Sequence, residues 1–171
     1  MPDIPAIRIG LGHDTHRLGA GGPMVLGGIT IDCDHHLIGH SDADVLLHAL
    51  TDALLGTVGA GDIGEHFPPS DQRWKDADSV EFLKHALNRV AQAGGRIEHV
   101  DLCLIGERPR MSPYKARIRK RLSDLLGLPV ASVNVKATTT EGLGFTGRKE
   151  GLAAQAVATV TLPPRGRESV D

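Results

Sequence analysis

The chain has few aromatic residues and no excess of basic residues. Aromatic residues make up 3% of its 171 residues, which argues against a base-stacking platform for single-stranded nucleic acid. Its formal net charge is −2, whereas a general nucleic-acid-binding protein carries a basic excess. No nucleic-acid partner is therefore expected.

The sequence also has little cysteine and no long hydrophobic run. Cys33 and Cys103 lie far apart and form no CxxC pair, so neither a disulfide framework nor a cysteine zinc site is predicted. The N-terminal residues lack the basic and apolar regions of a secretory signal, and no run of about 18 apolar residues occurs. We expect a cytoplasmic protein with reduced thiols and no membrane partner.

The length suits one domain, with a core at about residues 7–162 and a tail at 163–171. Alternating or β-branched segments predict strands at 6–11, 97–105, 133–137 and 152–162, and a short hairpin at 24–31 that is broken at Gly27-Gly28. Helices are predicted after the caps Asp42, Asp78 and Ser112-Pro113. This order favours an α+β fold, a two-layer sandwich with a small mixed β-sheet covered on one face by about three helices. The uncovered face would be apolar, which favours oligomerisation.

Histidine is abundant: six of the nine histidines lie within the first 48 residues. Asp14 and His16 stand two residues apart at the end of a predicted strand. Residues with this spacing point to the same side of a strand, so the two side chains could share one metal ion. So short a pattern also arises easily by chance.

His48 lies on the helix predicted after Asp42, off the apolar stripe that begins at Val45. Asp44, one turn earlier, is placed to accept a hydrogen bond from the second ring nitrogen of a metal-bound histidine. The common alternative is a surface histidine paired with acids. An Asp-His-His set would leave the fourth tetrahedral position open, as in catalytic zinc sites.

Two segments have the composition of phosphate sites. His40, Ser41 and Asp42 precede a helix whose first N–H groups would attract an anion. The threonines at 138–140 and Glu141 would suit a diphosphate with its divalent ion, although a threonine-rich strand end is the simpler interpretation. The glycines at 142–147 match GxGxxG, but a strand rather than a helix is predicted next, so we expect no dinucleotide site.

Four blocks, taken together, resemble the 2-C-methyl-D-erythritol 2,4-cyclodiphosphate synthase family in order and spacing. They are Gly12–His16, His40–Leu50, Gly61–Pro68 and Val133–Arg148. The resemblance covers about Ile7 to Leu162. It implies an enzyme of non-mevalonate isoprenoid biosynthesis, a phosphorus–oxygen lyase. Its substrate would be 4-diphosphocytidyl-2-C-methyl-D-erythritol 2-phosphate, which cyclises with release of CMP.

The resemblance also implies roles for individual residues. The zinc ligands would be Asp14, His16 and His48, and magnesium or manganese would bind near Glu141. His40 and Thr139 match residues that stabilise the transition state. The matches to substrate-binding residues are Ser41, Asp62, Ile63, Gly64, Phe67 and Asp71 for the methylerythritol phosphate, Thr138 for the diphosphate, and Arg110 and Met111 for the cytidine.

The family resemblance further implies a homotrimer whose sheets face the central axis and whose active sites are shared between subunits. A central cavity near Phe145 and Arg148 would be a place for an isoprenoid diphosphate. Three features depart from the family pattern. Pro69 stands where an acidic residue is frequent, Arg110 replaces a common lysine, and the bulky Glu107-Arg108 pair precedes Pro109. Arginine keeps the charge of lysine but has a different donor geometry.

Two other functions agree with the same residues. One is a metal-dependent phosphohydrolase, in which the metal would activate water. The other is a non-catalytic nucleotide or isoprenoid-phosphate-binding module with a structural metal. No Ser-His-Asp or Cys-His nucleophile is evident in the sequence, and phosphoryl transfer within one substrate requires none.

Overall fold

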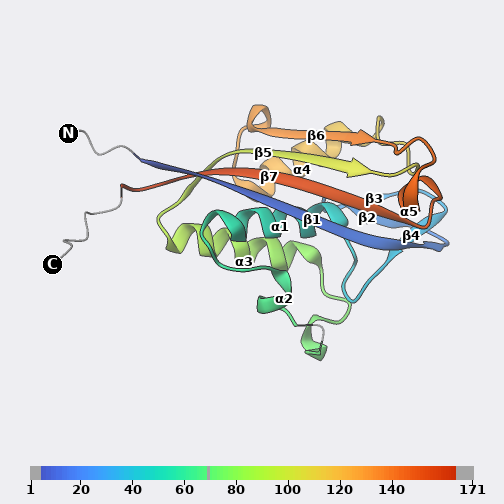
Figure 1. The fold of residues 1–171 in the computed structure, drawn as a ribbon, viewed down its shortest axis with the longest axis horizontal. Helices are drawn as coiled ribbons and strands as arrows, with labels where there is room; N and C mark the ends of the chain where they lie inside the picture. The colour runs from blue at the N-terminus through green and yellow to red at the C-terminus, as the bar shows by residue number, and fades with distance from the viewer. Residues whose placement is uncertain (1–4, 69, 165–171) are drawn as a thin grey trace.

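The computed structural model describes residues 5–68 and 70–164, so Pro69 and the tail from 165 onward lie outside it (Figure 1). The strands are β1 (Ala6–Ala20), β2 (Met24–Leu26), β3 (Ile29–Ile31), β4 (His35–Ile38), β5 (Arg96–Ile105), β6 (Val133–Thr138) and β7 (Gly151–Leu162). The α-helices are α1 (Val45–Thr57), α2 (Ile63–His66), α3 (Ser79–Gln92), α4 (Lys115–Leu126) and α5 (Gly144–Gly147). Two 3₁₀ turns, η1 (Gln72–Trp74) and η2 (Val130–Ser132), complete the elements.

Five strands form one mixed sheet in the order β4-β1-β7-β5-β6. Strands β1 and β7 pair antiparallel over most of their length, and β5 pairs antiparallel with β7 but parallel with β6. The separate β2–β3 hairpin turns at Gly27 and Gly28, as predicted. The predicted α+β class with a mixed sheet is confirmed.

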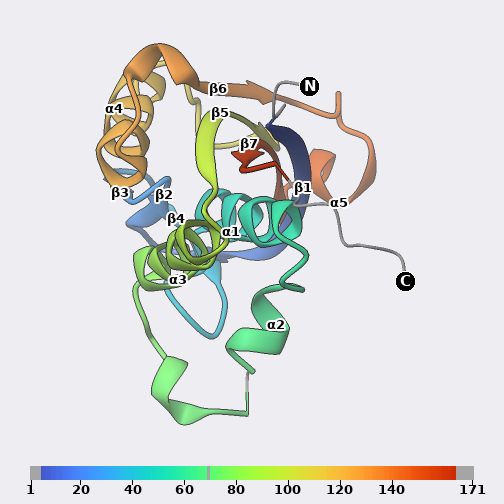
Figure 2. The same ribbon diagram turned by 90° about the vertical axis from the view of Figure 1, so that its left-hand side faces the viewer.

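The three longer helices lie on the same side of the sheet (Figure 2). On β1 the alternation of strand side chains separates the two faces: Gly10 and Gly12 are buried toward α1, whereas Ile9 and Leu11 point the other way. Their exposed fractions are 71% and 68%, so this half of the open face is apolar. No helix in the described part of the chain has the length and apolarity needed to cross a membrane.

Two glycines let α1 lie directly on β1. A Cβ atom at Gly12 would lie 1.8 Å from the carbonyl oxygen of Ala49, and one at Gly10 would lie 1.8 Å from that of Ala53. No side chain fits in that space, so glycine is required at both positions. The close approach brings His48, the neighbour of Ala49, next to the residues that follow Gly12.

The structure corrects four local predictions. Strand β1 continues to Ala20, because β7 pairs with it as far as Arg17 and β4 pairs with its last residues. Strand β4 lies in a segment for which no strand is predicted. The N-cap of α1 is Asp44 rather than Asp42. Helix α4 begins at Lys115, without a side-chain cap, rather than at Ser112-Pro113.

Candidate active site

Asp14 and His16 of β1 meet His48 of α1 on the helix-covered side of the sheet. One ligand atom from each lies within 4.8 Å of the other two. The Asp14 Oδ2 atom is 2.9 Å from His16 Nδ1 and 3.0 Å from His48 Nδ1. The predicted convergence of these three side chains is confirmed.

These residues fit a divalent metal ion. His16 Nδ1 is buried and lacks a hydrogen-bond partner among the described residues, although Asp14 Oδ2 lies 2.9 Å away. A buried ring nitrogen left in this way is costly unless another group binds it. Two imidazoles and one carboxylate leave one tetrahedral position open, which is the donor set of catalytic zinc sites.

The charges around the three ligands also favour a cation. Burial tends to raise the pKa of Asp14, but the two histidines outweigh it and hold this pKa well below the usual range. Burial tends to lower the pKa of His48, yet Asp14 raises it, with Asp44 and Asp42 adding to the effect. Burial, opposed by a hydrogen bond from the Ile63 N–H, raises the pKa of nearby Asp52.

Asp44 does not contact the second nitrogen of His48, so this prediction is wrong. Its carboxylate accepts the backbone N–H groups of Gly27, Gly28, Leu46 and Leu47 and is fully buried. Burial raises the pKa of Asp44 against these hydrogen bonds. The Ser79 hydroxyl of α3 takes the predicted place, with its Oγ atom 2.8 Å from His48 Nε2.

His48 is also more buried than a position off the apolar stripe suggests. Eleven of the thirteen residues of α1 are buried, and only Asp52 and Gly56 are not. The helix therefore has core contacts around nearly its whole circumference. Surrounded in this way, the His48 ring has a defined orientation before any ligand binds.

A pocket of about 200 Å³ opens beside the three ligands. Four residues predicted for substrate binding or catalysis line it: His40, Ser41, Ile63 and Phe67. Sequence reasoning missed Trp74 and Phe82, which form the aromatic side of the pocket. Phe67 packs against both, with ring centroids 4.8 Å from Trp74 and 4.6 Å from Phe82. The apolar spacing of α3 presented Phe82 only as a core residue.

Three other predicted residues of this region do not line the pocket. Asp62 is the N-cap of α2, where its side chain accepts the N–H of Glu65, and Gly64 lies within that helix. The carboxylate of Asp71 accepts a hydrogen bond from Arg73 at 2.6 Å, which lowers its pKa. Asp71 thus has a partner within its own exposed segment.

A second pocket, of about 230 Å³, lies between the chain after β5 and the end of β6. Two residues predicted for the cytidine, Arg110 and Met111, line it together with Thr138 and Thr139, which were predicted for the diphosphate and the transition state. Lys115 also lines it. Glu141 lies nearby, exposed, and accepts a hydrogen bond from Thr139 at 3.0 Å. The two pockets have no lining residue in common.

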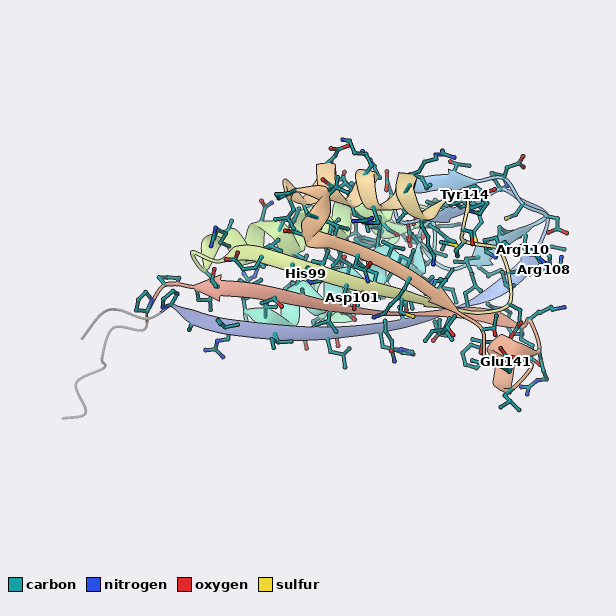
Figure 3. The ribbon with its side chains drawn as sticks, turned by 90° about the horizontal axis from the view of Figure 1, so that it is seen from above. His99, Asp101, Arg108, Arg110, Tyr114 and Glu141 are labelled. Carbon is teal, nitrogen blue, oxygen red and sulfur yellow. The ribbon has the colours of Figure 1, made fainter. Side chains whose placement is uncertain are left out.

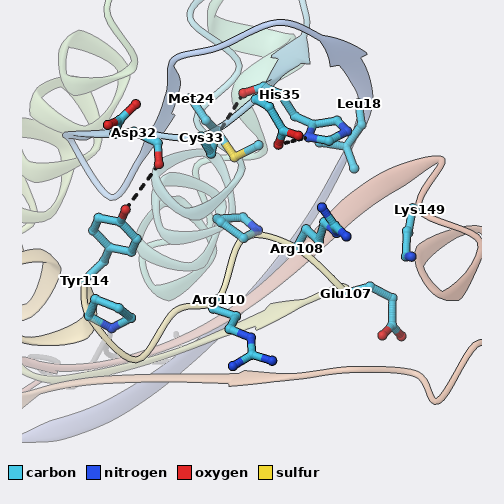
Figure 4. Close-up of a pocket in the computed structure, with 13 residues that line it drawn as sticks. Leu18, Met24, Asp32, Cys33, His35, Glu107, Arg108, Arg110, Tyr114 and Lys149 are labelled. Carbon is cyan, nitrogen blue, oxygen red and sulfur yellow. Dashed lines mark hydrogen bonds and ion pairs between the residues drawn. The ribbon is translucent and has the colours of Figure 1, made fainter.

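A larger cavity of about 620 Å³ adjoins the second pocket and shares Glu107, Pro109 and Arg110 with it. Arg108, Tyr114 and Lys149 are among its other lining residues (Figure 4). Arg108, Arg110 and Glu141 all lie toward the same end of the sheet, whereas His99 and Asp101 lie farther back along β5 (Figure 3). Phe145 and Arg148 belong to α5 and its cap, and Arg148 pairs with Glu150 at 3.0 Å.

Comparison with known proteins gives a family match over nearly the whole chain. Residues 7–161 match the YgbB family. The chain is 62% identical over 156 residues to the bifunctional enzyme IspD/IspF of Rhizorhabdus wittichii and 58% identical to that of Rhodospirillum rubrum. The alignments cover 91% of this chain but 41% of each relative, so the chain spans less than half the length of these curated proteins.

Solved structures share the fold. The bifunctional IspDF of Campylobacter jejuni matches with a TM-score of 0.89 and 40% identity, over 93% of this chain and 43% of that one. A CDP-bound 2C-methyl-D-erythritol-2,4-cyclodiphosphate synthase matches with a TM-score of 0.83 and 38% identity, over 90% of this chain and 99% of that one. The CDP complex of IspF from Plasmodium falciparum matches with a TM-score of 0.81 and 30% identity, over 93% of this chain and 97% of that one.

Proposed function

The chain belongs to the YgbB family, as the four sequence blocks predicted, and from this premise we propose its activity. It converts 4-diphosphocytidyl-2-C-methyl-D-erythritol 2-phosphate to 2-C-methyl-D-erythritol 2,4-cyclodiphosphate and CMP. An oxygen of the 2-phosphate attacks the β-phosphorus, and the bond from that phosphorus to the bridging oxygen of CMP breaks. Elimination of CMP without water makes the enzyme a phosphorus–oxygen lyase.

The observation that carries the proposal is the convergence of Asp14, His16 and His48 beside a pocket. These residues would hold zinc, and Glu141 would hold magnesium or manganese together with substrate phosphates, since Mg²⁺ commonly takes one or two carboxylates plus phosphates. Bound there, the two ions would supply Lewis-acid polarisation of the diphosphate. Nucleophile and electrophile belong to one molecule, so the protein's main task is alignment.

The pocket residues supply that alignment in the proposed reaction. His40 and Ser41 face the methylerythritol phosphate beside the metal ligands, with Ile63 and Phe67 against its carbon skeleton. Asp62, Gly64 and Asp71 join only if their segment moves against the bound substrate. Thr138 and Thr139 donate hydroxyl hydrogen bonds to the diphosphate, and Thr139 and His40 stabilise the charge that develops on it.

The cytidine is proposed to bind in the second pocket, where Arg110 and Met111 lie. Support comes from the CDP-bound structures to which the chain is similar. Because the two pockets share no residue, a substrate that reaches both requires them to be brought together. We propose that a neighbouring subunit does this, in a homotrimer with shared sites.

The open face of the sheet supports such an assembly. Ile7, Ile9 and Leu11 each expose more than two-thirds of their surface on one strand. Three such faces turned toward a common axis would bury this apolar surface, at about 25 cal/mol per Å² removed from water. Phe145 and Arg148 would border the axial cavity, where an isoprenoid diphosphate would bind. Residues 7–162 would form the single catalytic domain of each subunit.

Product analysis tests the activity. The chain, loaded with zinc and supplied with magnesium, should convert the cytidylated substrate to CMP and a cyclic diphosphate, identified by ³¹P NMR. Inorganic phosphate as the product would instead identify a phosphohydrolase. Binding without turnover, with unfolding when the metal is removed, would identify a binding module.

A further inference from the structure

We propose that Ser79 and Asp42 are positioning residues that determine which ring nitrogen of His48 faces the metal. The inference rests on the proposed metal site. Neither residue is among the predicted ligands or substrate contacts, yet both belong to a series of hydrogen bonds that ends on the His48 ring. The series runs from Asp42, in the loop before α1, through Ser79, the first residue of α3, to His48.

The contact between Ser79 and His48 is short and buried. Ser79 Oγ lies 2.8 Å from His48 Nε2, and the two residues are 0% and 8% exposed. On the other side of the ring, His48 Nδ1 lies 3.0 Å from Asp14 Oδ2. The two nitrogens of one imidazole therefore have different tasks, with Nδ1 toward the other ligands and Nε2 toward Ser79.

Asp42 determines whether Ser79 or His48 donates the hydrogen bond between them. The Ser79 hydroxyl also contacts Asp42 Oδ1, and the two oxygens of this carboxylate accept N–H groups from Asp44 and from Ser79 itself, each at 3.2 Å. An ionised carboxylate only accepts, so the Ser79 proton points toward Asp42. The Ser79 oxygen is then left to accept the Nε2–H of His48.

A proton on Nε2 leaves the lone pair on Nδ1 free. Metal-bound histidine is neutral, and the hydrogen bond made by the other nitrogen sets which one binds. The opposite tautomer would place a proton on Nδ1, toward Asp14, and that nitrogen could not bind a metal ion. Ser41 Oγ, at 3.2 Å from Nε2, is the longer of the two hydroxyl contacts.

The backbone holds this chain of side chains in place. The Asp42 N–H donates to the Ala77 carbonyl oxygen at 3.1 Å, and the Asp76 N–H donates to that of His40 at 2.8 Å. These two bonds join the loop before α1 to the segment that leads into α3. The relative placement of Asp42 and Ser79 is thus set by backbone hydrogen bonds.

Zinc affinity tests the proposal. In competition with a chromogenic chelator, Ser79→Ala and Asp42→Asn should each bind zinc about 10- to 100-fold more weakly than the wild type, the usual cost of losing such a partner. Ser123→Ala is the matched control. Ser123 is also a buried helical serine, but it donates to the carbonyl oxygen of Leu128 and does not line the metal pocket, so its zinc affinity should not change. Zinc affinity in Ser79→Ala equal to that of the control would overturn the proposal.

The nitrogen that faces the metal can be read in the zinc-loaded wild type. The ¹⁵N chemical shifts of the His48 ring should show zinc on Nδ1 and the proton on Nε2. Zinc on Nε2, with the proton on Nδ1, would overturn the proposal even where a variant does not fold. Because this measurement needs zinc binding but no turnover, a failure of the proposed activity remains distinguishable from a failure of this inference.

Discussion

The two pockets of the molecule are built in opposite ways. In the pocket around Asp14, His16 and His48, the ligands are partly or fully buried, and β1, α1 and α3 all contribute. The pocket around Arg110, Thr138 and Thr139 lies at the end of a parallel strand pair, and these three side chains are exposed. There the Glu141 carboxylate accepts a hydrogen bond from Thr139, two residues earlier in the chain.

The two pockets therefore differ in how their side chains are oriented and in what completes each site. The metal pocket orients its ligands within one chain, through packing and hydrogen bonds that exist without substrate. The second pocket presents exposed hydroxyl and charged groups, among them Thr138, Thr139 and Arg110, at one end of the sheet. In the function proposed above, the substrate and a second subunit supply the rest of this site.

The largest expected effect comes from removing a ligand of the metal pocket. His48→Ala should lose the zinc ion, from about one per chain to nearly none, and with it all turnover, because two ligands seldom retain zinc. Elemental analysis measures the metal and circular dichroism the fold, which should persist at reduced stability. His99→Ala, an exposed histidine of β5, is the control and should keep both metal and turnover. Full zinc retention in folded His48→Ala would refute the ligand assignment.

A substitution in the second pocket should lower kcat without changing zinc content or stability. Thr139→Ala should lower kcat by about 10²- to 10³-fold, by analogy with the loss of one oxyanion donor. Zinc content and the free energy of unfolding should stay as in the wild type, since the Thr139 side chain is exposed. Thr30→Ala, an exposed threonine of β3, should leave kcat unchanged. A loss of zinc in Thr139→Ala would mean that the two pockets are not separate in function.

Mixing the two variants tests whether neighbouring subunits share a site. His48→Ala should be inactive alone and Thr139→Ala strongly slowed. Refolded together in equal amounts, they should recover about a quarter of wild-type activity, if trimers form at random and each site uses two subunits. Verified subunit exchange without recovered turnover would show that each chain builds its site alone.

A side chain inserted between α1 and β1 should both destabilise the protein and disturb the metal pocket. Gly12→Ala forces a Cβ atom to within 1.8 Å of the Ala49 carbonyl oxygen, so the helix must move. Overpacking of this kind should lower the free energy of unfolding by about 3 kcal/mol. The movement displaces His48, so zinc affinity should fall as well. Denaturant titration and chelator competition measure the two effects, and unchanged values of both would contradict the close contact.

The sequence predicted the metal pocket better than its surroundings. The spacing of Asp14 and His16 places both on one face of a strand, and a helical position brings His48 within reach once β1 and α1 pack together. The role of Asp44 could not be read in this way, because Gly27 and Gly28 reach its carboxylate only through the tertiary fold. The same holds for Ser79, which stands 31 residues after His48.

Helix boundaries and pocket walls were predicted less well for a related reason. Asp42 and Asp44 are equally good caps by residue type, and only the partners of each carboxylate in the folded chain distinguish them. Trp74 and Phe82 carry no local signal for a pocket, since an aromatic residue of a wall and one of a core look alike in sequence. The family resemblance identified Phe67 but not the two rings that hold it.

The smallest expected effect comes from Gly56, a glycine of α1 itself, and it separates close packing from helix propensity. A Cβ atom at Gly56 would contact only the Gly10 Cα, at 3.8 Å, which is an ordinary van der Waals distance. Alanine is the better helix former by about 1 kcal/mol in a helix interior, and less than that is expected here because Gly56 is the next-to-last residue of α1. Gly56→Ala should therefore raise the free energy of unfolding by about 0.5 kcal/mol, with zinc affinity and turnover unchanged. A loss of stability similar to that of Gly12→Ala would mean that the whole length of α1 is pressed against β1, rather than only the part that Gly10 and Gly12 face.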